Sequence, residues 1–168
     1  MASEPCPQRR RRVLYRHFLR VSIFVLIGAS LASARDLALV SNKSNEVGGV
    51  TLPELVKVCK AQTNHWPDGK PVTFVMRAPS VPAMKVVLEK VYGMSESEVS
   101  GLIVTSNRGR PNHPAILVAS SDEDLVNKVA SLPGAIGVVD VYSINSSVAV
   151  IKVAGKLPLE PGYVLHGN

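Results

Sequence analysis

The chain has 168 residues, with 19 Lys and Arg against 13 Asp and Glu, so its formal net charge is +6. Six of the basic residues and one acidic residue precede position 34, so the remaining 134 residues carry a net charge of only +1. That length is enough for one domain with a hydrophobic core. A nearly neutral domain gives no electrostatic reason to expect a nucleic-acid partner.

The first 34 residues have the three parts of a secretory signal peptide. A basic segment, RRRRVLYRHFLR, precedes an apolar run from Val21 to Leu31, and Ala32-Ser33-Ala34 follows. The apolar run is short for a transmembrane helix. We therefore predict a signal peptide over residues 1–34, cleaved after Ala34, and one periplasmic domain over residues 35–168. The alternative is an uncleaved leader that anchors the protein to the membrane.

Cleavage at this point would leave one cysteine, Cys59, because Cys6 lies in the leader. A single thiol in an exported chain forms no internal disulfide framework. Cys59 shares a helical apolar stripe with Leu52, Leu55 and Val56, which predicts a buried side chain and not a reactive thiol.

The first half of the domain reads as strand, helix and strand. A short strand over Leu37–Val40 leads into a polar loop, and Thr51 with Glu54 forms a capping box at the start of a helix. That helix is predicted to end near Thr63-Asn64. The turn residues of WPDG, positions 66–69, then introduce a β-branched strand over Val72–Met76.

The second half continues the alternation. Ser80 is predicted to begin a second helix, which ends at Tyr92-Gly93, and Ser95 with Glu98 forms another capping box for a short helix to about Leu102. Four further segments are a strand over Ile116–Val118, a helix opened by Ser121, and strands over Ile136–Val139 and Val148–Val153. Alternating helices and strands predict an α/β three-layer sandwich, with a mostly parallel sheet and helices on both faces.

Arg77 and Ser80 are the strongest candidates for a ligand site. Arg77 directly follows the Val72–Met76 strand, and Ser80 stands where the next helix is predicted to begin. Ligands of open α/β sheets bind at the carboxyl ends of strands, and helix N-termini attract anions. The pair therefore indicates an oxyanion site. The alternative is structural, with Ser80 as an N-cap and Arg77 as a solvated strand end.

Three sequence motifs, in this order, resemble the phosphate-binding proteins of ABC transporters. They are LALVSNKSN from Leu37, the segment TLPELVKVCKAQTNHWPDGKPVTFVMR with its W-x-D-G turn and terminal arginine, and LPGAIGVV from Leu132. The resemblance implies one lobe of the type 2 periplasmic-binding-protein fold, a function in binding phosphate or a similar oxyanion, and a transporter or regulatory protein as partner. It implies no enzyme activity and no cofactor.

In the family, the phosphate loop runs from an arginine through Ser-Gly-Thr at a helix N-terminus. Arg77 matches the arginine and Ser80 lies near the serine, but Val81-Pro82 stand in place of Gly-Thr. Weaker candidates for anion contacts are Ser41, Arg108 and Arg110. The alternative function is an accessory or protein-interaction domain that has kept the lobe and lost the ligand.

No other chemistry has a sequence motif to support it. His65, His113 and His166 have no metal-ligand spacing, so we predict surface histidines and no metal site. The chain lacks the G-x-S-x-G, C-x-x-C and P-loop motifs, which leaves an enzyme without a recognisable nucleophile or phosphate cradle. Trp66 is predicted to be a hydrophobic plug beside its turn.

Overall fold

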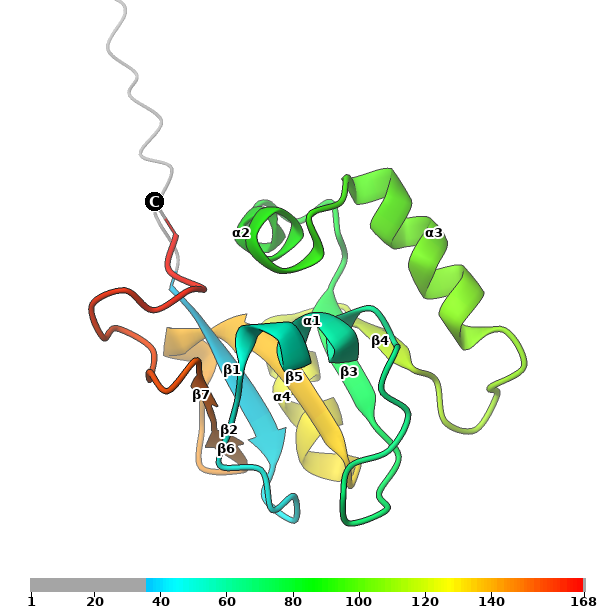
Figure 1. The fold of residues 1–168 in the computed structure, drawn as a ribbon, viewed down its shortest axis with the longest axis horizontal. Helices are drawn as coiled ribbons and strands as arrows, with labels where there is room; N and C mark the ends of the chain where they lie inside the picture. The colour runs from blue at the N-terminus through cyan, green and yellow to red at the C-terminus, as the bar shows by residue number, and fades with distance from the viewer. Residues whose placement is uncertain (1–35, 168) are drawn as a thin grey trace, which may run out of the picture. The chain divides into compact units, whose positions relative to one another are not determined.

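A computed structural model describes residues 36–167, drawn as a ribbon in Figure 1. The chain forms seven strands within that range: β1 (Leu37–Asn42), β2 (Gly49–Val50), β3 (Thr73–Arg77), β4 (Ile116–Ala119), β5 (Ala135–Asp140), β6 (Val148–Val150) and β7 (Lys152–Val153). Five of them form the main sheet, in the order β4-β3-β5-β1-β6. The predicted leader lies outside the described residues.

Four strands of the main sheet run in one direction and β1 runs against them. Strand β3 is parallel to both β4 and β5, whereas β1 is antiparallel to β5 and β6. The prediction of a mostly parallel sheet is confirmed. The predicted strand over Val148–Val153 is divided at Ile151 into β6 and β7, and β7 pairs with β2 in a small second sheet that the sequence did not indicate.

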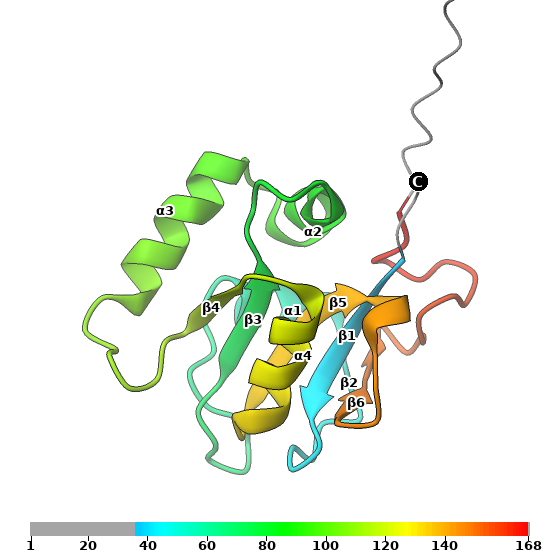
Figure 2. The same cartoon turned by 180° about the vertical axis from the view of Figure 1, so that it is seen from behind.

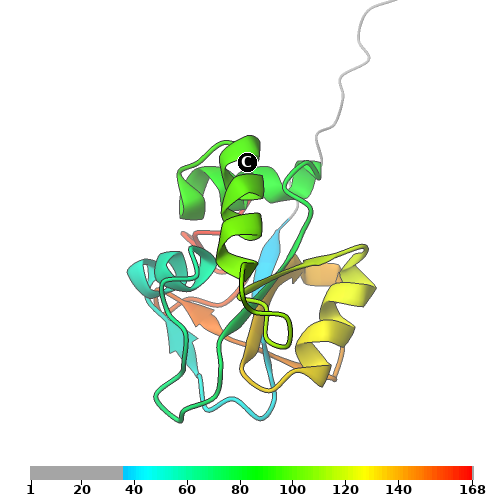
Figure 3. The same ribbon diagram turned by 90° about the vertical axis from the view of Figure 1, so that its right-hand side faces the viewer.

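Helices cover both faces of the sheet, which confirms the three-layer sandwich. They are α1 (Leu52–Cys59), η1 (Pro82–Met84), α2 (Lys85–Val87), η2 (Leu88–Tyr92), α3 (Glu96–Asn107), α4 (Asp122–Ser131) and η3 (Val141–Ser143). In Figure 1 α1 lies in front of the sheet; in Figure 2, seen from behind, α4 lies in front. Figure 3 shows the sheet between these two helices.

Each face has its own hydrophobic core. Leu55, Val58 and Cys59 of α1 pack with Phe74 and Met76 of β3 on one face. Leu125, Val126 and Val129 of α4 pack on the other face. The prediction that Cys59 is buried is confirmed: it is 0% exposed, and burial raises the pKa of its thiol well above the usual range. No helix of residues 36–167 is long and apolar enough to cross a membrane.

A glycine allows α4 to approach the sheet closely. A Cβ built on Gly137 in β5 would lie 3.0 Å from both Leu125 Cδ2 and Val129 Cγ2, and 2.8 Å from the backbone oxygen of Val75. Any larger side chain at this position would push α4 away from β5 or disturb the β3–β5 pairing. Gly137 therefore fixes how α4, and with it Asp122 at its first turn, sits on the sheet.

Both predicted capping boxes are present. Thr51 Oγ1 accepts from the Glu54 amide while Glu54 Oε2 accepts from the Thr51 amide, and Ser95 and Glu98 repeat the pattern. The Ser95 helix is longer than predicted, since α3 continues to Asn107. Leu102 at the predicted end and Ile103 just beyond it are partly buried against the core, and this packing extends the helix.

Candidate functional site

The carboxyl edge of the sheet presents Arg77, as predicted from the direction of its strand. Arg77 is the last residue of β3 and pairs in register with Ala119, the last residue of β4. Ser120 and Ser121 follow β4 and lead into α4. The nearest helix N-terminus is therefore that of α4, not that of the segment that follows β3.

Arg77 is held by an acidic residue in the first turn of α4. Its Nη1 donates to Asp122 Oδ1 over 2.9 Å, and the two side chains are 22% and 23% exposed. The Nε atom of Arg77 is buried and makes no hydrogen bond within the described part of the chain. Asp122 thus partly neutralises the guanidinium and orients it, while Nε of Arg77 has no hydrogen-bond partner among the described residues.

The other residues at the N-terminus of α4 are also acidic. Asp122, Glu123 and Asp124 occupy the first turn of α4, and Ser121 Oγ accepts from the Asp124 amide as its N-cap. Asp124 accepts hydrogen bonds from the Lys128 side chain and from the backbone and side chain of Ser120, and these lower the pKa of its carboxyl to about 2. Carboxylates at the positive end of a helix dipole stabilise the helix, but they compete with any external anion.

The prediction that Ser80 caps the next helix is wrong. Ser80 is exposed in a turn, and the N-cap residue is Val81, which makes no side-chain capping bond. The backbone closes this turn itself, because the Val81 amide donates to the Ala78 carbonyl over 3.0 Å. The helical segment after it is a 3₁₀ turn (η1), a three-residue α-helix (α2) and a π turn (η2). This segment therefore lacks the α-helix N-terminus that was expected beside Arg77.

Ser41 lies at the opposite edge of the sheet from Arg77. Because β1 is antiparallel, its last residues are level with the start of β5, and Ser41 pairs in register with Ile136. Its side chain is buried, with the hydroxyl donating to the Asn42 carbonyl and accepting from Asn45 Nδ2. Ser41 thus serves the loop after β1 and does not converge with Arg77.

Three of the segments that carried the sequence resemblance meet at the turn before β5. Trp66 Nε1 donates to the Gly134 carbonyl over 2.8 Å, and Asn45 Oδ1 accepts from the Gly134 amide over 2.7 Å. Trp66 is partly buried against the core, in keeping with a plug beside its turn. The meeting point is structural, and sequence reasoning did not identify Asn45 as part of it.

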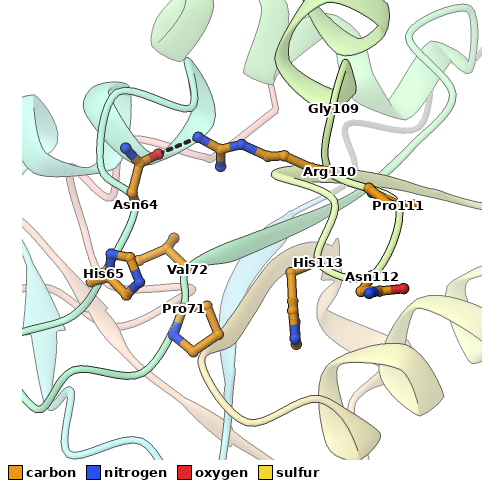
Figure 4. Close-up of a pocket in the computed structure, with 9 residues that line it drawn as sticks. All are labelled: Asn64, His65, Pro71, Val72, Gly109, Arg110, Pro111, Asn112 and His113. Carbon is orange, nitrogen blue, oxygen red and sulfur yellow. Dashed lines mark hydrogen bonds between the residues drawn. The ribbon is translucent and has the colours of Figure 1, made fainter.

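Arg108 and Arg110 are also remote from Arg77, because the loop that carries them precedes β4 and lies at the amino edge. Arg108 is exposed beyond the end of α3. Arg110 lines a cavity of about 420 Å³ together with two histidines that sequence analysis treated as unrelated, His65 and His113 (Figure 4). Within residues 36–167 no group of three His, Cys, Asp or Glu side chains is arranged to hold a metal ion.

No protein-family model matches the sequence, and no curated protein is significantly similar to it. Solved structures, in contrast, share its fold. An ABC-type phosphate transport receptor from Vibrio cholerae superposes with a TM-score of 0.62 at 20% identity, over 79% of this chain and 54% of the receptor. PstS from Borrelia burgdorferi superposes with a TM-score of 0.59 at 14% identity, over 80% of this chain and 55% of PstS.

A phosphate ABC transporter substrate-binding protein from Clostridium perfringens, solved with bound phosphate, superposes with a TM-score of 0.57 at 20% identity, over 72% of this chain and 46% of that protein. The chain thus matches only about half the length of these proteins, and those from Vibrio cholerae and Clostridium perfringens are named for phosphate transport. Its described part has the α/β fold of one lobe of the phosphate-binding proteins of ABC transporters.

Proposed function

We propose that this protein is an exported oxyanion-binding protein, related to the substrate-binding component of phosphate ABC transporters, with Arg77 as the centre of its site. The observation that carries the proposal is the position of Arg77. Arg77 lies at the carboxyl end of a parallel strand and beside the N-terminus of α4. The solved neighbours that share this fold bind phosphate. Ser80, exposed in the turn three residues after Arg77, is available as a further donor.

The Arg77–Asp122 pair favours an oxyanion that carries a proton. A guanidinium offers five N–H donors in a planar fork, and the 2.9 Å contact with Asp122 occupies Nη1. An ionised carboxylate only accepts hydrogen bonds, so an approaching anion must bring a proton to share with Asp122 or be repelled. Hydrogen phosphate and hydrogen arsenate carry such a proton at neutral pH, and sulfate does not.

Binding at this edge should be weak. No second lobe within residues 36–167 covers Arg77, and Asp122 already offsets part of its charge. We expect an affinity in the millimolar to high-micromolar range, which corresponds to about 4–6 kcal/mol of binding free energy.

The second candidate function is that of an accessory or protein-interaction domain with a transporter or regulatory protein as partner. The internal Arg77–Asp122 ion pair and the three acids in the first turn of α4 favour it, because they satisfy the site without a ligand.

Isothermal titration calorimetry with phosphate and with sulfate separates the two functions. We expect the wild-type protein to bind phosphate at least tenfold more tightly than sulfate. Arg77→Ala should abolish phosphate binding, and Asp122→Asn should make the two anions bind equally. Arg108→Ala removes an exposed arginine at the opposite edge of the sheet and is the matched control. We expect this variant to bind phosphate as tightly as wild type does.

Equal titrations of phosphate into wild type and Arg77→Ala, including no heat from either, would exclude the oxyanion site. The interaction-domain function would then stand. Circular dichroism of each variant checks that the fold is intact.

A further inference from the structure

The cavity beside Arg110 lies at the opposite edge of the sheet from Arg77. Its lining residues come from the segment before β3 and from the loop before β4, and Val72 forms its buried floor. Its volume of about 420 Å³ falls within the range of small-molecule sites, about 300–1,000 Å³, and is far larger than one inorganic oxyanion needs.

Hydrogen bonds close the first wall of this cavity into a hairpin-like turn. The Val72 amide donates to the Asn64 carbonyl over 2.9 Å, and the Trp66 amide donates to the Lys70 carbonyl over 2.9 Å. The indole of Trp66 also ties this turn to Gly134. His65 is therefore presented from a braced segment.

The second wall is a closed loop between α3 and β4. Asn107 clamps its two ends, because Asn107 Nδ2 donates to the Ile116 carbonyl over 2.7 Å and Asn107 Oδ1 accepts from the Ile116 amide over 3.0 Å. Just before β4, the Pro114 carbonyl also accepts from Thr73 Oγ1 of β3 over 3.1 Å. Arg110 and His113 thus project from a loop that is held at both ends.

Arg110 bridges the two walls, and no carboxylate of the described residues forms an ion pair with it. Its Nη2 donates to Asn64 Oδ1 over 2.7 Å, and Figure 4 shows the side chain reaching across the opening to Asn64. The acceptor is a neutral amide, and Arg110 makes no ion pair within the described residues, in contrast to Arg77 with Asp122. No Asp or Glu of residues 36–167 lines the cavity.

The other lining groups suit an anion with an apolar body. His65 and His113 line the cavity from its two opposite walls (Figure 4), and their imidazoles offer N–H donors. The rings of Pro71 and Pro111 and the side chain of Val72 supply apolar surface between and beside them. A positioned, uncompensated guanidinium is the group that recognises carboxylate and phosphate oxygens bidentately.

We propose that this cavity is a second binding site, separate from Arg77, for a small organic anion that carries one carboxylate or phosphate group. The anionic head contacts Arg110 with His65 and His113 nearby, and the apolar body lies against Pro71, Pro111 and Val72. Carboxylate and phosphate share the chemistry that Arg110 recognises, so the probes below include both.

Two-dimensional ¹H–¹⁵N NMR of the purified protein tests this site with benzoate, phenyl phosphate and benzamide. Benzamide has the shape of benzoate without its charge. We expect benzoate or phenyl phosphate to shift the amide signals of Asn112 and His113, and to bind at least tenfold more tightly than benzamide. The tighter of the two anions identifies the preferred head group.

Arg110→Gln should weaken binding of that anion at least tenfold. Arg108→Gln makes the same charge change two residues away, outside the cavity lining, and should alter the affinity less than twofold. The spectra themselves report whether each variant is folded. The proposal is overturned if neither anion binds more tightly than benzamide, or if the two arginine variants have equal effects.

Arg77→Ala should leave this binding unchanged. Loss of benzoate binding in Arg77→Ala but not in Arg110→Gln would overturn the cavity site while supporting the oxyanion site at the other edge. Failure of one site is thus distinguishable from failure of the other.

Discussion

The indole nitrogen of Trp66 donates a hydrogen bond to the carbonyl oxygen of Gly134, over 2.8 Å, and so joins the turn before β3 to the turn before β5. Asn45 binds the same turn, since its Oδ1 accepts from the Gly134 amide and its Nδ2 donates to the Ala135 carbonyl over 3.0 Å. The loop after β1 and the turns before β3 and β5 therefore form one structural unit at the amino edge of the sheet.

Gly134→Ala should strongly destabilise the protein. Gly134 has a φ of +86°, and a Cβ there would lie 2.0 Å from the backbone oxygen of Pro71. Left-handed strain and overpacking together should lower the free energy of unfolding by about 2–5 kcal/mol. Urea denaturation followed by circular dichroism measures the change.

Gly155→Ala is the matched control for Gly134→Ala. Gly155 has a similar φ of +79°, but nothing lies within 4 Å of its built Cβ. It should therefore show only the strain, about 1–2 kcal/mol. Equal losses in the two variants would mean that the contact with Pro71 does not constrain position 134.

Ala154→Asn should stabilise the turn that ends β7. Ala154 and Gly155 both have positive φ, 52° and 79°, between Val153 and Lys156, whose backbones exchange hydrogen bonds of 2.9 and 3.0 Å. This is the type I′ geometry that favours Asn-Gly. We expect a gain of about 1 kcal/mol in thermal or urea unfolding. Ala154→Val, which places a β-branched residue at the same φ, should lose at least as much; a gain from both substitutions would contradict the turn geometry.

Asp124 should make stability depend on pH in the acid range. Its hydrogen bonds to Lys128 and Ser120 lower its pKa to about 2 from an ordinary value of 3.8, so the folded state binds the proton less readily than the unfolded state. Its contribution to stability is therefore present above about pH 4 and is lost as the pH falls toward 2. The effect should be small, because the group is at the surface.

Urea unfolding of Asp124→Asn between pH 7 and pH 2 measures this contribution. The variant should be less stable than wild type at pH 7 and equal to it near pH 2. A difference for Asp124→Asn that does not change with pH would rule out the linkage.

The leader should be absent from the exported protein. Ala32-Ser33-Ala34 follows a short apolar run, so the mature chain is expected to begin at Arg35. Intact-mass measurement on protein from the periplasmic fraction decides this, and Ala34→Leu should block the cleavage. A wild-type species that retains Val21–Leu31 would instead support the membrane anchor.

Local patterns predicted most of the elements correctly. The capping boxes at Thr51 and Ser95 and the cap at Ser121 form because each depends on residues within one helical turn. Ser80 has the same hydroxyl, but the backbone turn from Ala78 to Val81 places it one residue before the cap. A hydroxyl before an apolar stripe does not by itself reveal how the chain enters the helix.

The site could be predicted only in part, because its contacts cross between strands. The strand direction was enough to place Arg77 at the carboxyl edge. Its partner Asp122 follows only once β4 is known to lie beside β3, with Arg77 level with Ala119. His65 and His113 likewise share no local spacing, and it is the β3–β4 pairing that brings their loops together.

Strand β1 occupies an inner position of the sheet although it is the first strand of the described chain. Leu37 pairs with Asp140, about 100 residues later, and β6 flanks β1 on its other side. The sheet therefore has a high contact order, and both edges of β1 stay unpaired until most of the chain has been synthesised. A domain built in this way completes its sheet late, which would suit the export that the predicted signal peptide implies.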